Sequence, residues 1–117
     1  MAQKLHLICS SEDLPEGGKG VRFVVETEAG ERPAFVIRYA GVPSAFVNSC
    51  AHMGVELDWM PTEFFDDSGL YLVCATHGAL FLPGSGACIA GPCKGKSLRA
   101  LSVEERDGAV FLVEGKG

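Results

Sequence analysis

The sequence predicts an all-β protein, a small antiparallel barrel or sandwich that carries a loop-rich insert. Three observations predict this fold. Val, Ile, Phe, Tyr and Thr are concentrated in short runs, 15 glycines interrupt any helical periodicity, and turn residues separate the runs. Because 117 residues is the size of one domain, we expect residues 1–117 to form a single domain.

The expected strands lie towards the two ends of the chain. The strongest hairpin signal is Asp107-Gly108 between two alternating runs, because a type I′ turn needs positive φ at both central positions. Ala29-Gly30 is the expected turn of an earlier hairpin, and Gly41 is expected to break the strand that follows it. In chain order, the expected strands cover residues 4–9, 21–27, 33–40, 43–49, 97–106 and 109–114.

The middle of the chain has a different pattern. Between Cys50 and Pro92 the apolar runs are short, and only residues 70–73 and 79–82 resemble strands. Residues 61–67 (PTEFFDD) are expected to form one helical turn or a surface loop. Loops on a rigid scaffold usually carry function. We therefore expect ligands to bind in the loops between about residues 48 and 94.

Charge and hydropathy exclude several classes of function. The formal net charge is −5 and there is no run of Lys or Arg, so the chain lacks the basic surface that nucleic-acid binding requires. No stretch approaches the roughly 18 apolar residues of a membrane span, and the first residues lack the long apolar segment of a secretory signal. We therefore expect a cytoplasmic protein. In that reducing compartment, five cysteines favour metal ligation over disulfides.

Two short motifs supply soft and borderline metal ligands. Residues 50–52 are Cys-Ala-His and residues 74–77 are Cys-Ala-Thr-His, with 21 residues, 53–73, between them. Two Cys with two His suit either tetrahedral zinc or a [2Fe–2S] cluster. Zinc fingers usually pair Cys with Cys and His with His in each half. The mixed halves here favour the cluster, because both thiolates can then bind one iron and both imidazoles the other.

The chain resembles the Rieske [2Fe–2S] proteins, whose motif is C-x-H, then C-x-x-H, then a third loop that contains proline. Residues 91–92 (Gly-Pro) stand at the position of that third loop. The resemblance implies one Rieske-type [2Fe–2S] cluster and the small antiparallel barrel of the family. It also implies the ligands: Cys50 and Cys74 bind the inner iron, and His52 and His77 bind the outer iron.

This chain differs from one branch of the family at several positions, which indicates the branch that it resembles most. Rieske subunits of bc complexes have two further cysteines that form a disulfide between the loops, and this chain has Val55 and Thr76 there. The serine and tyrosine that donate hydrogen bonds to the cluster in that branch are replaced by Ala79 and Phe81. Fewer donors lower the reduction potential. The chain is therefore most similar to the soluble, low-potential Rieske-type ferredoxins.

The resemblance implies a one-electron carrier and not an enzyme. Its expected partners are a flavin reductase as electron donor and a terminal oxygenase, of the type that attacks aromatic rings, as acceptor. The sequence shows no nucleophile–base pair and no G-x-G-x-x-G motif after a strand, so no catalytic or nicotinamide-binding residues are expected. Two alternatives remain open. One is a small Rieske subunit of a nitrite-reductase-like enzyme, and the other is a regulatory module with a Cys2His2 metal site.

The remaining cysteines and the remaining histidine are not expected to bind metal. Cys9 is expected to be a small buried hydrophobic residue, and His6 to lie on the solvent face of the first strand. Cys88 and Cys93 flank the third loop, where two thiols are expected rather than a disulfide.

Aromatic and acidic residues of the insert allow two interpretations. The aromatic residues are expected to pack the insert onto the barrel, with a docking or electron-transfer surface as the alternative. The acidic residues are expected to form a solvated loop, with a patch for a basic partner as the alternative. The aromatic residues are Trp59, Phe64, Phe65 and Tyr71, and the acidic ones are Glu63, Asp66 and Asp67.

Overall fold

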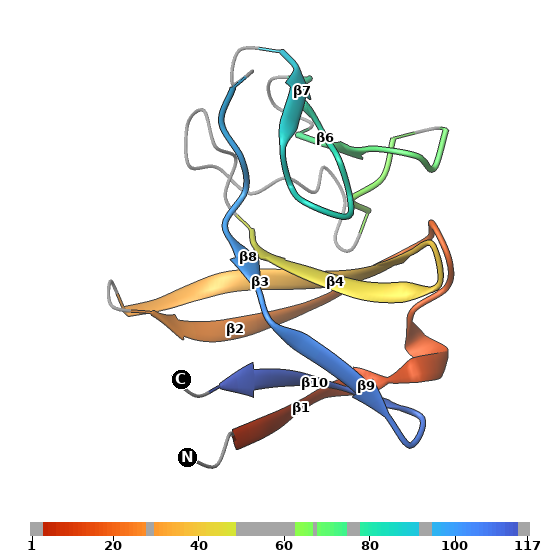
Figure 1. The fold of residues 1–117 in the computed structure, drawn as a ribbon, viewed down its shortest axis with the longest axis vertical. Helices are drawn as coiled ribbons and strands as arrows, with labels where there is room; N and C mark the ends of the chain where they lie inside the picture. Colours follow the sequence, from red (N-terminus) through yellow and green to blue (C-terminus); the bar gives the residue numbers. More distant parts are fainter. Residues whose placement is uncertain are drawn as a thin grey trace.

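The structure is a computed structural model that describes residues 4–27, 30–48, 63–66, 68–74, 78–91 and 95–114. These residues form short strands and one 3-10 helix (Figure 1). The elements are β1 (Lys4–Ser10), η1 (Ser11–Asp13), β2 (Val21–Thr27), β3 (Gly30–Tyr39), β4 (Val42–Val47), β5 (Leu72–Val73), β6 (Leu80–Phe81), β7 (Cys88–Ala90), β8 (Ala100–Leu101), β9 (Val103–Arg106) and β10 (Ala109–Glu114). In this described part of the chain, no helix is long and apolar enough to cross a lipid bilayer.

The strands pair in three antiparallel sheets, which confirms the all-β prediction. One sheet has the order β1-β10-β9, the second β2-β3-β4-β8, and the third β5-β6-β7. The second sheet lies in the middle of the molecule, with the first sheet on one side and the small third sheet on the other (Figure 1). The third sheet belongs to the insert, so the central sheet connects the barrel to the insert.

Strand β3 has apolar side chains on both faces because the central sheet is covered on both sides. Its residues 34–37 (AFVI) are fully buried. Phe35 and Ile37 pack with residues of the insert, whereas Val36 packs against the β1-β10-β9 sheet. A continuous apolar run, rather than alternation, is the pattern expected of a strand buried on both faces.

Two type I′ hairpins fold the barrel. Asp107 and Gly108 have φ of 51° and 77° between β9 and β10, which confirms the predicted turn. The second hairpin joins β3 to β4 through Ala40 and Gly41, with φ of 56° and 82°. At this position the sequence predicts only a break in the strand, at Gly41. The Glu16 carboxylate holds this turn, since it accepts hydrogen bonds from the backbone N–H groups of Ala40 at 2.6 Å and Gly41 at 2.9 Å.

Most predicted strands are present with small shifts of their ends. Strand 21–27 is confirmed at both ends, and β3 begins at Gly30 instead of residue 33. Gly30 pairs with Thr27 in the β2–β3 ladder, so it is a strand residue and not part of a turn; Ala29 lies outside the described residues. The expected strand 97–106 is split, because Ser97 makes an isolated bridge to Ala87 before β8 and β9 begin.

The prediction of a helical turn in residues 61–67 is wrong for the described residues 63–66. Phe65 forms an antiparallel bridge with Leu72, and Phe64 is fully buried, so this segment is neither helical nor a simple surface loop. The physical reason is the burial of Phe64 against the barrel, which holds the segment in an extended conformation beside β5. Residues 61, 62 and 67 lie outside the described part of the chain.

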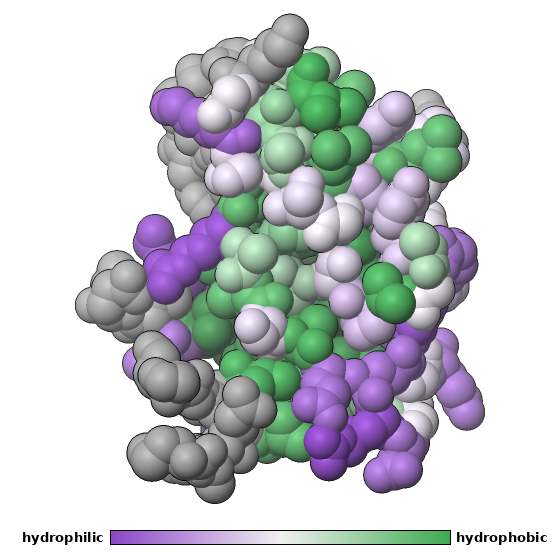
Figure 2. All heavy atoms as spheres, viewed as in Figure 1, coloured by the Kyte–Doolittle hydropathy of each residue, from purple (hydrophilic) through white to green (hydrophobic). Residues whose placement is uncertain are grey.

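Charged and apolar surfaces lie at different ends of the molecule. In Figure 2 charged residues gather over β9 and the β9–β10 turn, where Glu105, Arg106 and Asp107 are exposed. Hydrophobic residues gather at the opposite end, over β7, where Ile89 is 36% exposed. The insert therefore presents a less charged surface than the barrel does on this face.

Candidate metal centre

Cys74 lies directly after β5, at the start of a turn that returns to β6. Its backbone N–H donates a hydrogen bond to the Ala79 carbonyl at 2.9 Å, and its carbonyl accepts one from the Gly78 N–H at 2.7 Å. Gly78 has φ of 71°, a left-handed conformation that glycine adopts without strain. Both ends of segment 74–79 are thus held by backbone hydrogen bonds, as a ligand loop requires.

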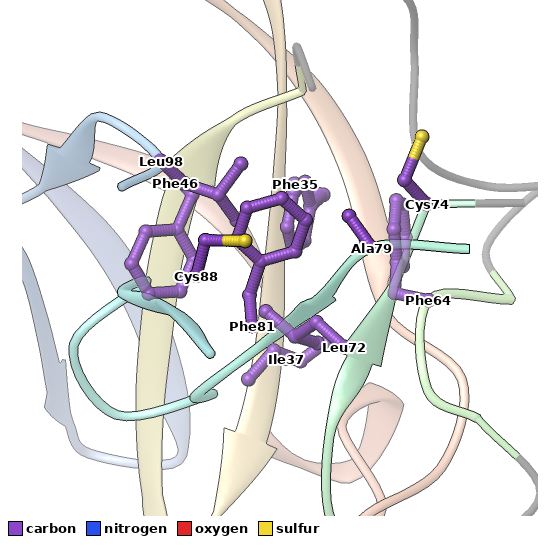
Figure 3. Close-up of a cluster of buried hydrophobic side chains, with 10 residues drawn as sticks. All are labelled: Phe35, Ile37, Phe46, Phe64, Leu72, Cys74, Ala79, Phe81, Cys88 and Leu98. Carbon is purple, nitrogen blue, oxygen red and sulfur yellow. The ribbon is translucent and has the colours of Figure 1, made fainter. Parts of the chain in front are cut away.

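The Cys74 side chain lies at the edge of an apolar layer between barrel and insert. It is fully buried, and its sulfur points away from the packed aromatic rings (Figure 3). This layer consists of Phe35, Ile37, Phe46, Phe64, Leu72, Cys74, Ala79, Phe81, Cys88 and Leu98. A thiolate in this position is backed by side chains that exclude water from its inner side.

The third loop begins against the Cys74 turn. Gly91 follows β7 with φ of 100°, and a Cβ atom there would lie 2.7 Å from the Ala79 Cα. Only glycine permits so close an approach. The pairing of Leu80 with Ala90 in the β6–β7 ladder brings the two segments together. The start of the third loop, at Gly91, therefore lies against the end of the turn that begins at Cys74.

The structure places one of the four predicted ligands. Cys74 is described, whereas Cys50, His52 and His77 lie outside the described residues. Among the residues that the structure does describe, no three metal-ligating side chains come together. Predictions on residues 55, 59, 76, 92 and 93 also fall outside the described ranges.

Cys9 and His6, which were not expected to be ligands, occupy the predicted environments. Cys9 is 9% exposed in the core between the two barrel sheets, where burial raises the pKa of its thiol. His6 is exposed on β1. Cys88 is buried, and its thiol donates to the Ala90 carbonyl at 3.3 Å. The expectation of two thiols also involves Cys93, so it stays a prediction.

Described aromatic residues of the insert pack inwards. The Phe64 ring stacks on Phe35 of the barrel with ring centroids 4.0 Å apart, and Phe65 packs at the edge of the same layer. This confirms that Phe64 and Phe65 pack the insert onto the barrel; Tyr71 is half-buried.

The described acidic residues of the insert have local partners. Glu63 forms an ion pair with Lys19 at 3.7 Å, and the Asp66 carboxylate accepts a hydrogen bond from the Ser68 hydroxyl at 2.7 Å. These local contacts partner both carboxylates, although the segment that carries them is anchored by the buried Phe64.

Comparison with protein families decides the nature of this centre. A family model described as the Rieske [2Fe-2S] domain matches residues 4–110. The chain belongs to the Rieske [2Fe–2S] family. The cofactor of this Rieske chain is accordingly one Rieske-type [2Fe–2S] cluster, as the sequence motifs predicted. Among functionally curated proteins, no sequence matches it significantly.

Solved structures with the same fold include both ferredoxins and oxygenases. A ferredoxin of Sphingomonas yanoikuyae B1 has a TM-score of 0.72 and 24% identity, covering 96% of this chain and 100% of its own. The ferredoxin of carbazole 1,9a-dioxygenase from Nocardioides aromaticivorans IC177 has a TM-score of 0.70 and 23% identity. The match covers 97% of this chain and 99% of that ferredoxin. The terminal oxygenase of the same dioxygenase has a TM-score of 0.72 and 21% identity, covering 97% of this chain but 30% of its own.

The described residues fit a Rieske cluster. Cys74 offers the soft sulfur ligand that iron–sulfur clusters use, at the start of a turn whose ends its own backbone holds together. No described heavy atom lies within 4 Å of the position of a Cβ on Gly78, so the backbone there is accessible to bulky inorganic sulfur. The zinc alternative loses its support, because the family's metal group is an iron–sulfur cluster.

Proposed function

We propose that this Rieske protein is a one-electron carrier whose cluster is held by Cys50, His52, Cys74 and His77. The two cysteines bind the inner iron and the two histidines the outer iron. The observation that supports this proposal best is the fully buried Cys74, at the start of a turn that the third loop contacts through Gly91. The two C-x-H and C-x-x-H motifs and the family match support the remaining ligands.

The residues of the chain have separate tasks in electron transfer. When bound, the cluster supplies a centre that takes up and releases one electron at a time. Cys74 loses its thiol proton to become a ligand, and the apolar layer behind it keeps water from the inner side. The outer ring nitrogens of His52 and His77 lose protons more readily when the iron is oxidised, so the reduction potential is expected to fall at alkaline pH.

The proposed partners are a flavin reductase as donor and a terminal oxygenase as acceptor. The printed names of the structural neighbours support this choice, since one describes a ferredoxin of a carbazole dioxygenase and another a complex of oxygenase and ferredoxin. We infer an aromatic-ring oxygenase by this analogy. The formal charge of −5 favours a partner with a basic surface. The single domain over residues 1–117 and the cytoplasmic location stay predictions.

Metal analysis with electron paramagnetic resonance (EPR) tests the cluster. The purified protein is expected to contain two irons and two sulfides per chain. It should be EPR-silent when oxidised and give the rhombic, low-average-g signal of a His-ligated cluster after dithionite. Zinc without sulfide would overturn the proposal.

Two alanine variants test the ligand assignment. Cys74→Ala is expected to remove the iron, because the inner iron loses a thiolate. Cys88→Ala is the matched control, since Cys88 is also buried in the same apolar layer. It should keep iron and signal. Equal iron loss in both variants would contradict the assignment of Cys74, because burial alone would then explain the effect.

Reconstitution with partners tests the direction of electron flow. The reduced protein is expected to be reoxidised rapidly by a terminal Rieske oxygenase charged with an aromatic substrate, and re-reduced by a flavin reductase with NADH. Stopped-flow absorbance of the cluster measures both rates. Rapid exchange with a nitrite reductase and none with an oxygenase would instead support the nitrite-reductase-like alternative.

A further inference from the structure

Phe64 occupies a socket in the barrel. Its ring is fully buried and stacks on Phe35, with centroids 4.0 Å apart and planes 12° from parallel. The backbone of Gly20 also borders this socket. A Cβ atom on Gly20 would lie 2.9 Å from the Phe64 Cδ2 and 2.6 Å from the Val36 carbonyl oxygen. The ring therefore fits because residue 20 has no side chain.

The backbone of Phe64 is joined to the strand that carries Cys74. The Phe64 carbonyl accepts a hydrogen bond from the Val73 N–H at 2.9 Å, and Phe65 forms a bridge with Leu72. Both partners belong to β5, and Cys74 follows directly. Through its ring and its carbonyl, Phe64 thus connects the barrel to the residue before the ligand.

Neighbouring contacts hold the same two segments together. Gly17 packs against Gly69, where a Cβ atom on Gly17 would lie 3.3 Å from the Gly69 carbonyl oxygen. Lys19 and Glu63 form an ion pair at 3.7 Å. The loop before β2 therefore lies along the segment around Phe64, and Gly20 is the point where the aromatic ring enters the barrel.

We propose that Phe64 is a positioning residue that fixes the Cys74 turn against the barrel and so controls water access to the metal centre and its reduction potential. The inference rests on the proposed role of Cys74 as a ligand. If the ring leaves its socket, β5 keeps only the packing of Leu72 on the barrel, and water reaches the Cys74 side. Water stabilises the more highly charged reduced state of the centre, so the reduction potential is expected to rise.

The test compares two Phe→Leu variants of the holoprotein. Phe64→Leu leaves a cavity in the socket. Phe46→Leu leaves a cavity of the same size in the same apolar layer, but Phe46 lies on β4 and contacts the β6–β7 turn at Gly86. Three quantities are measured: the rate of iron release to a chelator, the reduction potential, and hydrogen–deuterium exchange of peptides covering residues 72–74.

Phe64→Leu is expected to release iron at least tenfold faster, to raise the reduction potential and to speed exchange at residues 72–74. Phe46→Leu should change the rates of iron release and exchange less than twofold and shift the reduction potential less than Phe64→Leu does. The two variants should lower thermal stability by similar amounts. Equal effects of the two variants would overturn the proposal, since general loss of packing would then explain them.

A second variant keeps the test valid if Phe64→Leu does not fold. Gly20→Ala places a methyl group 2.9 Å from the Phe64 ring, 2.7 Å from the Ile37 Cγ2 and 2.6 Å from the Val36 carbonyl oxygen. It should reproduce the faster exchange and iron release. Unchanged exchange at residues 72–74 in Gly20→Ala would also overturn the proposal. The exchange measurement does not depend on the cluster, so it still reports on the Phe64 anchor if the wild type lacks a Rieske signal and the proposed function fails.

Discussion

Glycine and alanine positions around the Cys74 turn illustrate how single residues shape this centre. Gly91 approaches Ala79 so closely that any side chain would collide with the backbone, while its φ of 100° disfavours every other residue. From the sequence, residues 91–92 were recognisable as a third loop. Contact of Gly91 with Ala79 was not, because it depends on the pairing of β6 with β7.

Gly91→Ala is expected to destabilise the protein more than Gly95→Ala does. Gly95 has a nearly identical φ of 97°, but among the described residues no heavy atom lies within 4 Å of an added Cβ. Backbone strain alone should cost about 1–2 kcal/mol in Gly95→Ala. The collision with Ala79 should add roughly 1–2 kcal/mol in Gly91→Ala. Urea unfolding measures both free energies, and equal losses would show that the close approach is unimportant.

At the scale of elements, the β3–β4 hairpin shows how an unfavourable turn residue is tolerated. Ala40 adopts φ of 56°, which is unfavourable for a residue with a Cβ atom. Hydrogen bonds from the Ala40 and Gly41 N–H groups to the Glu16 carboxylate compensate for this strain. The sequence alone predicts only a break at Gly41, because Glu16 is far away in sequence and its contribution appears only in the folded chain.

Ala40→Asn is expected to increase the free energy of unfolding by about 0.5–1 kcal/mol. Asparagine adopts positive φ more readily than alanine and is favoured in type I′ turns. The hydrogen bond to the Glu16 carboxylate uses only the backbone N–H of residue 40, so the substitution retains it. Gly41→Ala is the reciprocal control and should lose about 1 kcal/mol. Thermal or urea unfolding decides, and a destabilised Ala40→Asn protein would contradict this account of the turn.

For the molecule as a whole, the Arg38–Glu105 pair connects the central sheet to the β1-β10-β9 sheet. The Arg38 guanidinium donates to both carboxylate oxygens of Glu105, at 3.0 and 2.6 Å, and its Nε donates to the Leu14 carbonyl at 2.8 Å. The Arg38 side chain is only 14% exposed. Hydrogen bonding from Arg38 lowers the pKa of Glu105 from its usual 4.5 to about 2.

Glu105→Gln is expected to lower the free energy of unfolding at pH 7 by about 1 kcal/mol, the upper end for exposed ion pairs, because the pair is bidentate. The folded-state pKa lies below the unfolded one, so the stabilisation is complete above pH 4.5 and is lost as the pH falls towards 2. Urea unfolding of the wild type and Glu105→Gln between pH 7 and pH 3 measures the difference in their free energies of unfolding. Acid effects on the metal centre are the same in both proteins and cancel in this difference. A difference that is independent of pH would contradict this assignment.

The sequence by itself determined the chemistry of this protein and most of its strands. Ligand type and spacing are local properties, so the four predicted ligands and the family were readable from residues 50–52 and 74–77. Hairpin turns such as Asp107-Gly108 were readable too, because the demand for positive φ is also local.

Only the tertiary structure decided how the insert is held on the barrel. The extended segment 63–66, strand β7 and the role of Gly20 depend on contacts between residues far apart in the chain. Residues 63–66 carry a pattern compatible with a helical turn, and burial of Phe64 between Phe35 and Gly20 overrides that local preference. Burying an aromatic side chain contributes about 1.5–3 kcal/mol. This is more than the helix propensities of a four-residue segment contribute.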